Sequence, residues 1–329
     1  MIARFLGSAP CHSRDRPRAR AAQIAAMLAL GAALLLYGSS SSLAQAPAMD
    51  QRTNGLIMLI EFEQIEGIRQ WEQQLDRRKL TALVQAQHDL IARHPKDFAR
   101  LALKGYPIAG LFAEKPFWDV PYKEQLARMR EVKEAIERTI VHKTMRVFGS
   151  RYFAYDENTL RAADALGVEY VLARGTAAER AIVYAPREYK AKIISVSNVP
   201  FAEMGTGSLC DYSLWARGST DADFANVVQN VLARRPSDVI LVSHAYLGGT
   251  KAKWWRTYEA ALQNSHVRWR RFDDWVKAVS QIDLPYDQIP VNREVKYQAP
   301  KPATPLEQIE NIPGMSTIAP GKTDDLLCQ

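Results

Sequence analysis

Acidic and amide side chains end the apolar run LIMLI of this sequence. Glu61, Glu63 and Gln64 follow it directly, and His244 follows a second apolar run, VILV, in the same way. Runs of this length predict buried strands, and α/β enzymes place catalytic groups at the carboxyl ends of their strands. A carboxylate and an imidazole can act as general base and general acid. Glu63 and His244 are therefore the candidate catalytic pair, with Glu61 as a candidate binding residue beside them.

Positive charges follow other predicted strands, where they can stabilise negative charge that develops during a reaction. Lys115 and Arg151 are the candidates for this role. Glu114 and Asp119 lie near Lys115 in the sequence and allow a second interpretation, an acid cluster with an internal counter-ion. An ion pair of Glu63 with Lys115 is the simplest use of these residues. We prefer it to a metal site built from the acids.

The histidine and cysteine spacings do not predict a metal site. His88 and His94 are six positions apart, whereas two ligands on one helix face are four apart, so we expect both at the surface. Cys210 and Cys328 can form a disulfide in an oxidising compartment. Such a bridge would fix the C-terminal end of the chain to the domain.

A basic and aromatic patch lies late in the sequence. It contains Trp254, Trp255 and Arg256, followed by a second group, WRR, at residues 269–271. The preferred interpretation is a packed helix and strand whose arginine head groups reach solvent. The alternative is a surface on which sugars stack or an anionic glycan binds, and it makes Trp254 and Trp255 candidate binding residues.

The first 44 residues have the order of a secretory signal: a charged segment, an apolar segment and small residues before a cleavage position. The segment contains five arginines and one aspartate, so cleavage lowers the formal net charge from +7 to +3. The main argument for nucleic-acid binding is thereby lost. We expect a secreted or periplasmic protein. An uncleaved membrane anchor is the alternative, and membrane contact is expected only through this segment.

Strands and helices are expected to alternate through the middle of the chain. Apolar runs predict strands near residues 56–62, 80–86, 106–112, 147–148, 170–172, 193–196, 239–242 and 267–271. Helical patterns lie between them, most clearly at residues 122–139. This alternation indicates parallel βαβ units, and about seven of them suit a single α/β domain shaped as a deformed barrel. We expect a short lead at residues 45–54, the barrel at residues 55–283 and a proline-rich extended tail at residues 284–329.

Four segments in this order resemble the polysaccharide deacetylases with a NodB homology domain, carbohydrate esterase family four. They are LTALVQAQHDLIARHPKDFARLALKGYPIAG, FGSRYFAYDENTLRAADALGVEYVLA, VILVSH and VRWRRFDDW. The resemblance covers about residues 56–279. It implies the barrel fold and metal-assisted hydrolysis of a C–N bond that is not a peptide bond. In that chemistry one Asp and two His hold the metal, a second Asp is the base and a late His is the acid.

The residues at the family's metal positions do not suit zinc. The resemblance places Glu63 at the base and His244 at the acid, but Gln64, Leu111 and Lys115 at the three metal ligands. A neutral amide, an apolar side chain and a cation cannot replace one carboxylate and two imidazoles. We therefore expect no cofactor.

The family's third-motif arginine has no exact counterpart in this sequence. The resemblance places it at Gly149, with Arg151 and Arg146 nearby as substitutes.

The resulting functional expectation is a secreted or periplasmic polysaccharide-deacetylase-like protein that binds or acts on glycans of the cell envelope or an exopolysaccharide. One alternative is an active deacetylase or amide hydrolase with a site rebuilt around Glu63 and His244. A second alternative is a non-enzymatic scaffold that binds protein partners of an envelope complex.

Overall fold

The computed structural model describes residues 52–61, 65–140, 143–176, 179–201, 205–291, 302 and 304–315. The chain divides into a unit of residues 1–50 and a compact unit of residues 51–329, and the second contains all of the described residues. The predicted signal segment, Glu63, Gln64 and Cys328 lie outside the described residues. Among the helices that are described, none is both long enough and apolar enough to cross a membrane.

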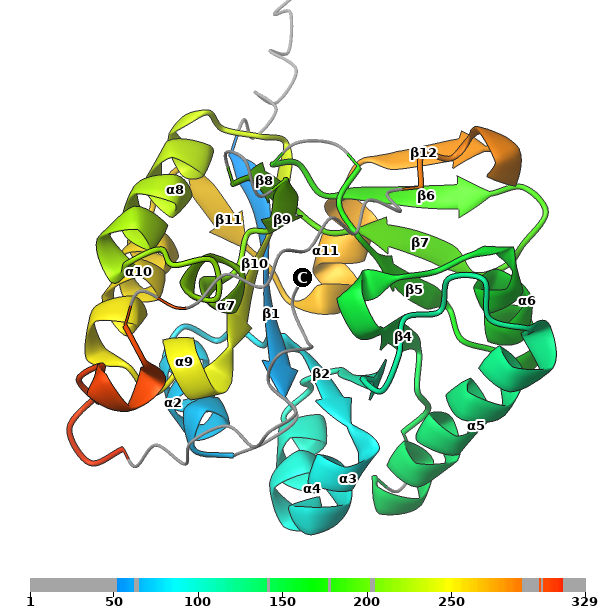
Figure 1. Cartoon of the computed structure of the whole chain (residues 1–329), viewed down its shortest axis with the longest axis horizontal. Coiled ribbons are helices and arrows are strands. Elements are labelled where there is room, and N and C mark those ends of the chain that lie inside the picture. Colours follow the sequence, from blue (N-terminus) through cyan, green and yellow to red (C-terminus); the bar gives the residue numbers. More distant parts are fainter. Residues whose placement is uncertain are drawn as a thin grey trace, which may run out of the picture. The chain divides into compact units, whose positions relative to one another are not determined.

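The core of the domain is a ten-stranded sheet in the order β10-β1-β2-β3-β4-β5-β7-β6-β12, with β11 paired to the start of β1. Its strands are β1 (Thr53–Glu61), β2 (Leu83–Gln87), β3 (Ile108–Phe112), β4 (Val147–Ser150), β5 (Tyr170–Ala173), β6 (Ile182–Pro186), β7 (Lys192–Ser195), β10 (Asp238–His244), β11 (Val267–Trp269) and β12 (Gln281–Leu284). All pairs are parallel except β6 with β7. The predicted deformed barrel is confirmed: the sheet curls into a half-barrel (Figure 1).

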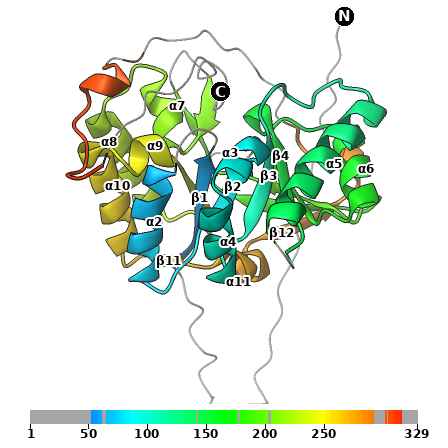
Figure 2. The ribbon, with the colours of Figure 1, turned by 90° about the horizontal axis from the view of Figure 1, so that it is seen from below.

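Helices lie around the outside of this half-barrel (Figures 1 and 2). They are α2 (Glu66–Asp76), α3 (His88–Arg93), α4 (Pro95–Leu103), α5 (Tyr122–Thr139), α6 (Glu157–Leu166), α7 (Asp211–Trp215), α8 (Asp221–Ala233), α9 (Ala245–Gly248), α10 (Ala252–Gln263) and α11 (Phe272–Ala278). A small hairpin of β8 (Asn198–Pro200) and β9 (Thr206–Ser208) follows β7. The sequence patterns did not predict β6, β12, this hairpin, α7 or α9.

Local sequence signals explain where several elements begin and end. Helix α5 has exactly the predicted bounds, and its apolar stripe of Met129, Val132 and Ile136 is buried. Asp156 caps α6 by accepting from the backbone of the third residue of the helix, which forms a capping box. Gly167 ends α6 in the left-handed conformation (φ +69°) that glycine adopts without strain.

Helix α11 crosses the amino ends of the strands. Asp273, at its first turn, accepts a hydrogen bond from Arg146, which directly precedes β4, at 2.7 Å. Phe272 packs edge-on against Tyr170, the first residue of β5. Because the amino end is covered in this way, the carboxyl ends of the strands are the end of the barrel that is left for a binding site.

Part of the proline-rich segment is docked on the domain. Lys251 donates through Nζ to the Ile309 carbonyl at 3.0 Å and to Asn311 Oδ1 at 2.8 Å. Trp215 donates to the Thr304 carbonyl at 2.9 Å. The segment at residues 304–315 contains a short 3-10 helix, Leu306–Gln308, and packs on the domain around Lys251 and Trp215, which composition alone did not predict.

Candidate functional site

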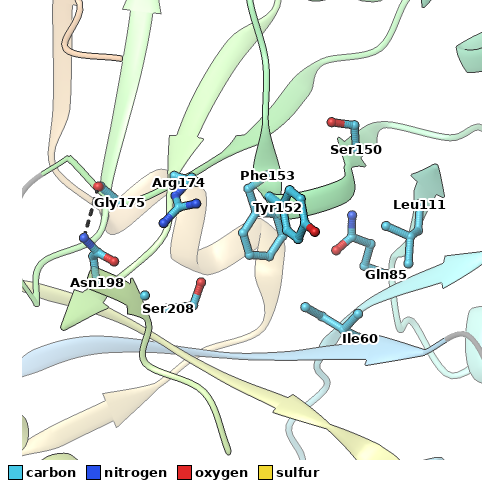
Figure 3. A pocket seen from close by; sticks show the side chains of 11 residues that line it. Ile60, Gln85, Leu111, Ser150, Tyr152, Phe153, Arg174, Gly175, Asn198 and Ser208 are labelled. Atoms are coloured by element: carbon cyan, nitrogen blue, oxygen red, sulfur yellow. Dashed lines mark hydrogen bonds between the residues drawn. The ribbon is translucent and has the colours of Figure 1, made fainter. Parts of the chain in front are cut away.

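A small pocket opens at the carboxyl ends of the strands (Figure 3). Its polar lining comes from five different strands and the turns after them: Gln85, Ser150, Tyr152, Arg174, Asn198 and Ser208. Ile60, Leu111 and Phe153 supply apolar surface. The pocket volume of about 10 Å³ is close to what one water molecule needs, so the enclosed space has room for a water-sized group and not for a whole sugar ring.

Gln85 lies at the base of the pocket, on β2. Its side chain is fully buried, and Nε2 donates to the Gly149 carbonyl at 3.2 Å. The other amide atom, Oε1, is buried and has no hydrogen-bond partner among the described residues. Most buried polar atoms in proteins are hydrogen-bonded, so this oxygen is an available acceptor beside the pocket.

Arg174 brings positive charge to the pocket wall. It follows β5 directly, and only 7% of the residue is exposed. Its Nη2 donates to the Thr206 carbonyl at 3.2 Å in β9. Asn198 lines the same wall and donates to the Gly175 carbonyl at 3.3 Å (Figure 3). Both side chains are thus held in place by backbone oxygens, which fixes the polar wall before any ligand arrives.

The turn after β4 holds two residues in an unusual backbone conformation. Tyr152 has φ +62° and Phe153 has φ +53°, a region that residues other than glycine rarely adopt. Arg151 lies next to them, stacks over the Tyr152 ring at 4.8 Å and donates to the Glu114 carbonyl at 3.1 Å. Strained residues of this kind concentrate at ligand sites. Because the Arg151 side chain bonds the Glu114 carbonyl, it connects the turn after β4 to the turn after β3. Arg151 does not line the pocket itself.

A buried polar cluster lies beside the pocket. It consists of Cys210 and Asp211, at the start of α7, and His244, at the end of β10, and each is 0% exposed. Cys210 Sγ is 3.3 Å from His244 Nδ1, which is 3.7 Å from Asp211 Oδ1. Ile60 pairs with His244 on one side and with Gln85 on the other. Neighbouring strands are about 4.8 Å apart, so the cluster lies roughly 10 Å from Gln85 across the sheet.

The surroundings of His244 favour its charged form. Burial by itself lowers the pKa of the imidazole, but electrostatic and hydrogen-bond interactions with Cys210 and Asp211 outweigh burial and raise that pKa to about 10. The Tyr212 ring stacks on the imidazole with 4.9 Å between centroids. The predicted acid is a fully enclosed group in this structure and does not line the pocket.

The predicted charge stabilisers behave differently from one another. Lys115 pairs with Glu124 at the start of α5 and does not line the pocket. This partner corrects the predicted role, because an oxyanion stabiliser must face the reacting atoms. Arg151 does reach the carboxyl end of the barrel, as described above. Arg146 lies at the amino end, paired with Asp273, and so does not replace the family's arginine.

Trp254 and Trp255 are not available to a sugar, which corrects the candidate binding role given to them. They are 2% and 6% exposed. Trp254 stacks on Phe224, and Trp255 packs edge-on against Trp71 with 5.0 Å between centroids. The preferred interpretation, a packed helix, is the correct one, because α10 uses both rings to cover the core.

Two of the three positions that the resemblance gives to metal ligands, Leu111 and Lys115, are described. Leu111 lines the pocket with an apolar side chain and is 4% exposed. Lys115, at the second position, pairs with Glu124. An apolar side chain and an ammonium paired with a carboxylate have no lone pair to offer a metal. Gln64 and the candidate base Glu63 lie outside the described residues, and of Glu61 only the strand backbone is described.

Sequence reasoning missed Asp211, Gln85 and Arg174, and assigned Cys210 only to a disulfide. In this structure the Cys210 thiol contacts His244 and Asp211. Two of the missed residues had a usable signal: Gln85 interrupts an apolar strand, and Arg174 comes directly after one. Asp211 had a weaker sequence signal, since its burial depends on β10, which is distant in the sequence.

Comparisons with known proteins concern the fold. No family model matches the sequence, and no curated protein matches it. A Mycobacterium smegmatis protein described as a polysaccharide deacetylase superimposes with a TM-score of 0.54 at 11% identity, over 74% of this chain and 98% of that one. A Pseudomonas aeruginosa protein described in the same way gives 0.52 at 13% identity, over 70% and 91%. An allantoinase gives 0.51 at 13% identity, over 74% and 94%. The predicted polysaccharide-deacetylase fold is thus confirmed.

Proposed function

We propose that this chain is a polysaccharide-deacetylase-like protein of the cell envelope or exterior that binds a glycan at the carboxyl ends of its strands, without the family's zinc chemistry. The pocket of Gln85, Arg174 and Asn198 carries this proposal. It supplies amide and guanidinium groups, which bind the hydroxyl, acetamido and carboxylate groups of sugars. Leu111 within the same pocket supports the loss of zinc.

The alternative of a rebuilt hydrolase receives less support from the geometry. It requires His244 to donate a proton to a substrate, and this residue is 0% exposed. A second requirement, Glu63 as base, is testable directly. In an assay of acetate release from acetylated polysaccharides, we expect no activity from the full chain. Should activity appear, its survival in Glu63→Gln would exclude this base, and its loss would favour the hydrolase.

The binding proposal is tested with the full chain and a panel of neutral, N-acetylated and acidic polysaccharides, using isothermal titration calorimetry. We expect at least one class to bind. Arg174→Gln should then weaken binding about tenfold or more, because a buried charged hydrogen bond contributes roughly 1.5 kcal/mol or more. Arg256→Gln is the matched control, since Arg256 is exposed on α10, away from the pocket.

Two outcomes would contradict the proposal. One is the absence of binding to every polysaccharide class. The other is equal weakening by Arg174→Gln and Arg256→Gln, which would place the contact on the surface patch. The partner-scaffold alternative predicts instead that deletion of residues after Leu284 abolishes recovery of a protein partner, while glycan binding stays unchanged.

A further inference from the structure

The three side chains of the buried cluster converge on one point. Cys210 Sγ, Asp211 Oδ1 and His244 Nδ1 are separated by 3.3, 3.4 and 3.7 Å. In a nucleophilic triad the nucleophile and the acid contact opposite nitrogens of the imidazole. Here the sulfur and the carboxylate oxygen both lie at Nδ1. The arrangement is therefore that of ligands around a common centre and not that of a proton relay.

The size of the triangle matches a metal ion. Its edges are nearly equal, so its centre lies about 2 Å from each atom, and zinc takes nitrogen and oxygen ligands at about 2.0–2.2 Å and thiolate at about 2.3 Å. A thiolate, an imidazole and a carboxylate are also the three side-chain types that zinc prefers in proteins. Among the described residues, this is the one group of three such side chains close enough together to hold an ion.

Hydrogen bonds to both oxygens fix the Asp211 carboxylate in place, so an ion would share Oδ1 with two backbone N–H groups while Oδ2 keeps an outer hydrogen bond. Asp211 Oδ1 accepts from the backbone N–H groups of Tyr212 at 2.6 Å and His244 at 2.9 Å. Its other oxygen accepts from Ser243 Oγ at 2.8 Å, and that hydroxyl accepts in turn from Trp71 Nε1 at 3.3 Å. Outer hydrogen bonds of this kind orient metal-binding carboxylates and are a regular part of metal sites.

We infer that Cys210, Asp211 and His244 bind one zinc ion, which joins the start of α7 to the end of β10. The site is distinct from the family's metal positions at Gln64, Leu111 and Lys115, and it is independent of glycan binding. Three protein ligands leave a fourth position for water or another small ligand. Since all three residues are 0% exposed, the first effect of the ion is on stability and on the placement of these two elements.

The first experiment measures metal in the full chain, purified under reducing conditions without chelator, by elemental mass spectrometry. We expect close to one zinc per chain. The ion is then removed with a chelator and replaced by cobalt(II), whose bond to a thiolate gives an intense charge-transfer band in the near ultraviolet. We expect this band at one equivalent of cobalt. We also expect removal of the ion to lower the melting temperature by about 5 °C or more, because binding to the native state alone stabilises it.

Two variants locate the ion. Cys210→Ser should abolish the charge-transfer band, and Cys328→Ser, which changes a thiol elsewhere in the chain, should keep it. The readout on the wild-type chain decides the matter even if Cys210→Ser does not fold. A wild-type protein that holds no metal as purified and gives no cobalt–thiolate band overturns the inference, and the cluster is then a proton-sharing group. A band that survives in folded Cys210→Ser also overturns it, because the ion then lies elsewhere.

Discussion

Replacing Gln85 by Met tests whether the buried amide serves a ligand or the fold. The wild-type side chain makes one hydrogen bond, to the Gly149 carbonyl, and its Oε1 has no partner among the described residues. The substitution removes that bond, which contributes about 0.5–1.5 kcal/mol, and also removes the unpaired oxygen, whose burial costs about 1–3 kcal/mol. The two effects oppose each other. We expect the free energy of unfolding to stay within about 1 kcal/mol of the wild-type value.

Gln125 offers a matched control in the same domain, because it is equally buried but has its hydrogen bonds made. Its Nε2 donates to the Phe117 and Val120 carbonyls and to Asp156, and its Oε1 accepts from Thr159. Gln125→Met removes all four of these hydrogen bonds at once, one of them to the Asp156 carboxylate. We expect it to lower the free energy of unfolding by at least about 3 kcal/mol.

The assay is denaturant unfolding followed by circular dichroism, together with calorimetric titration of the glycan that the wild-type chain binds. Gln85→Met should weaken glycan binding about tenfold, which corresponds to one buried hydrogen bond of roughly 1.4 kcal/mol. The reasoning is refuted if Gln85→Met destabilises the fold as much as Gln125→Met does. It is refuted equally if Gln85→Met binds the glycan as tightly as the wild-type chain.

Three further predictions concern stability. Burial alone raises the pKa of Glu72, but hydrogen bonds from Arg100 and a neighbouring lysine outweigh burial and lower it below its usual 4.5. Glu72→Gln should therefore lower the free energy of unfolding by about 1–3 kcal/mol near neutral pH. When unfolding is measured as a function of pH, this difference between variant and wild type should shrink as the pH falls below about 4.5, because protonation of Glu72 then removes the native pairing. Lys251→Met removes the two hydrogen bonds of the Lys251 ammonium, to Ile309 and Asn311. Limited proteolysis should then cut residues 304–315 faster than in the wild-type chain, whereas an equal rate would show that the remaining contacts hold the segment. Gly67→Ala would place a methyl group 1.9 Å from the carbonyl oxygen of the first residue of α9, so we expect the free energy of unfolding to fall by more than about 2 kcal/mol. A thermal melt that matches the wild type would contradict this close packing.

The sequence patterns predicted the barrel well because the signals for its helices and their ends come from residues that are neighbours in the sequence. The helix at residues 122–139, the break at His94 and the glycine at Gly167 each depend on neighbouring residues, and the structure has all of them where expected. Strand β6 was missed because AIVYAP is short and ends in proline. Its pairing with β7 is antiparallel, which an alternating βα pattern does not predict.

The site was harder to predict because it depends on contacts between distant segments. His244 was found from its place after a strand, but its partners Cys210 and Asp211 come from another element more than thirty positions away. Trp254 and Trp255 were kept as an alternative binding surface because tryptophan serves both in helix packing and in sugar stacking, and the adjacent arginines suit either role. Glu63 remains a prediction, since it lies outside the described residues.

The position of β1 has a consequence for how the domain folds. It pairs with β2 soon after it in the chain, but its other partners are β10 and β11, and Asn54 bonds Asp238 across 184 positions. Contacts over such separations form slowly, and an unpaired apolar strand edge invites association with other chains in the meantime. Strand β1 is therefore synthesised early but can pair with β10 and β11 only after most of the domain has been made. A shortened chain that lacks β10 and β11 would leave β1 as an unprotected edge of its sheet.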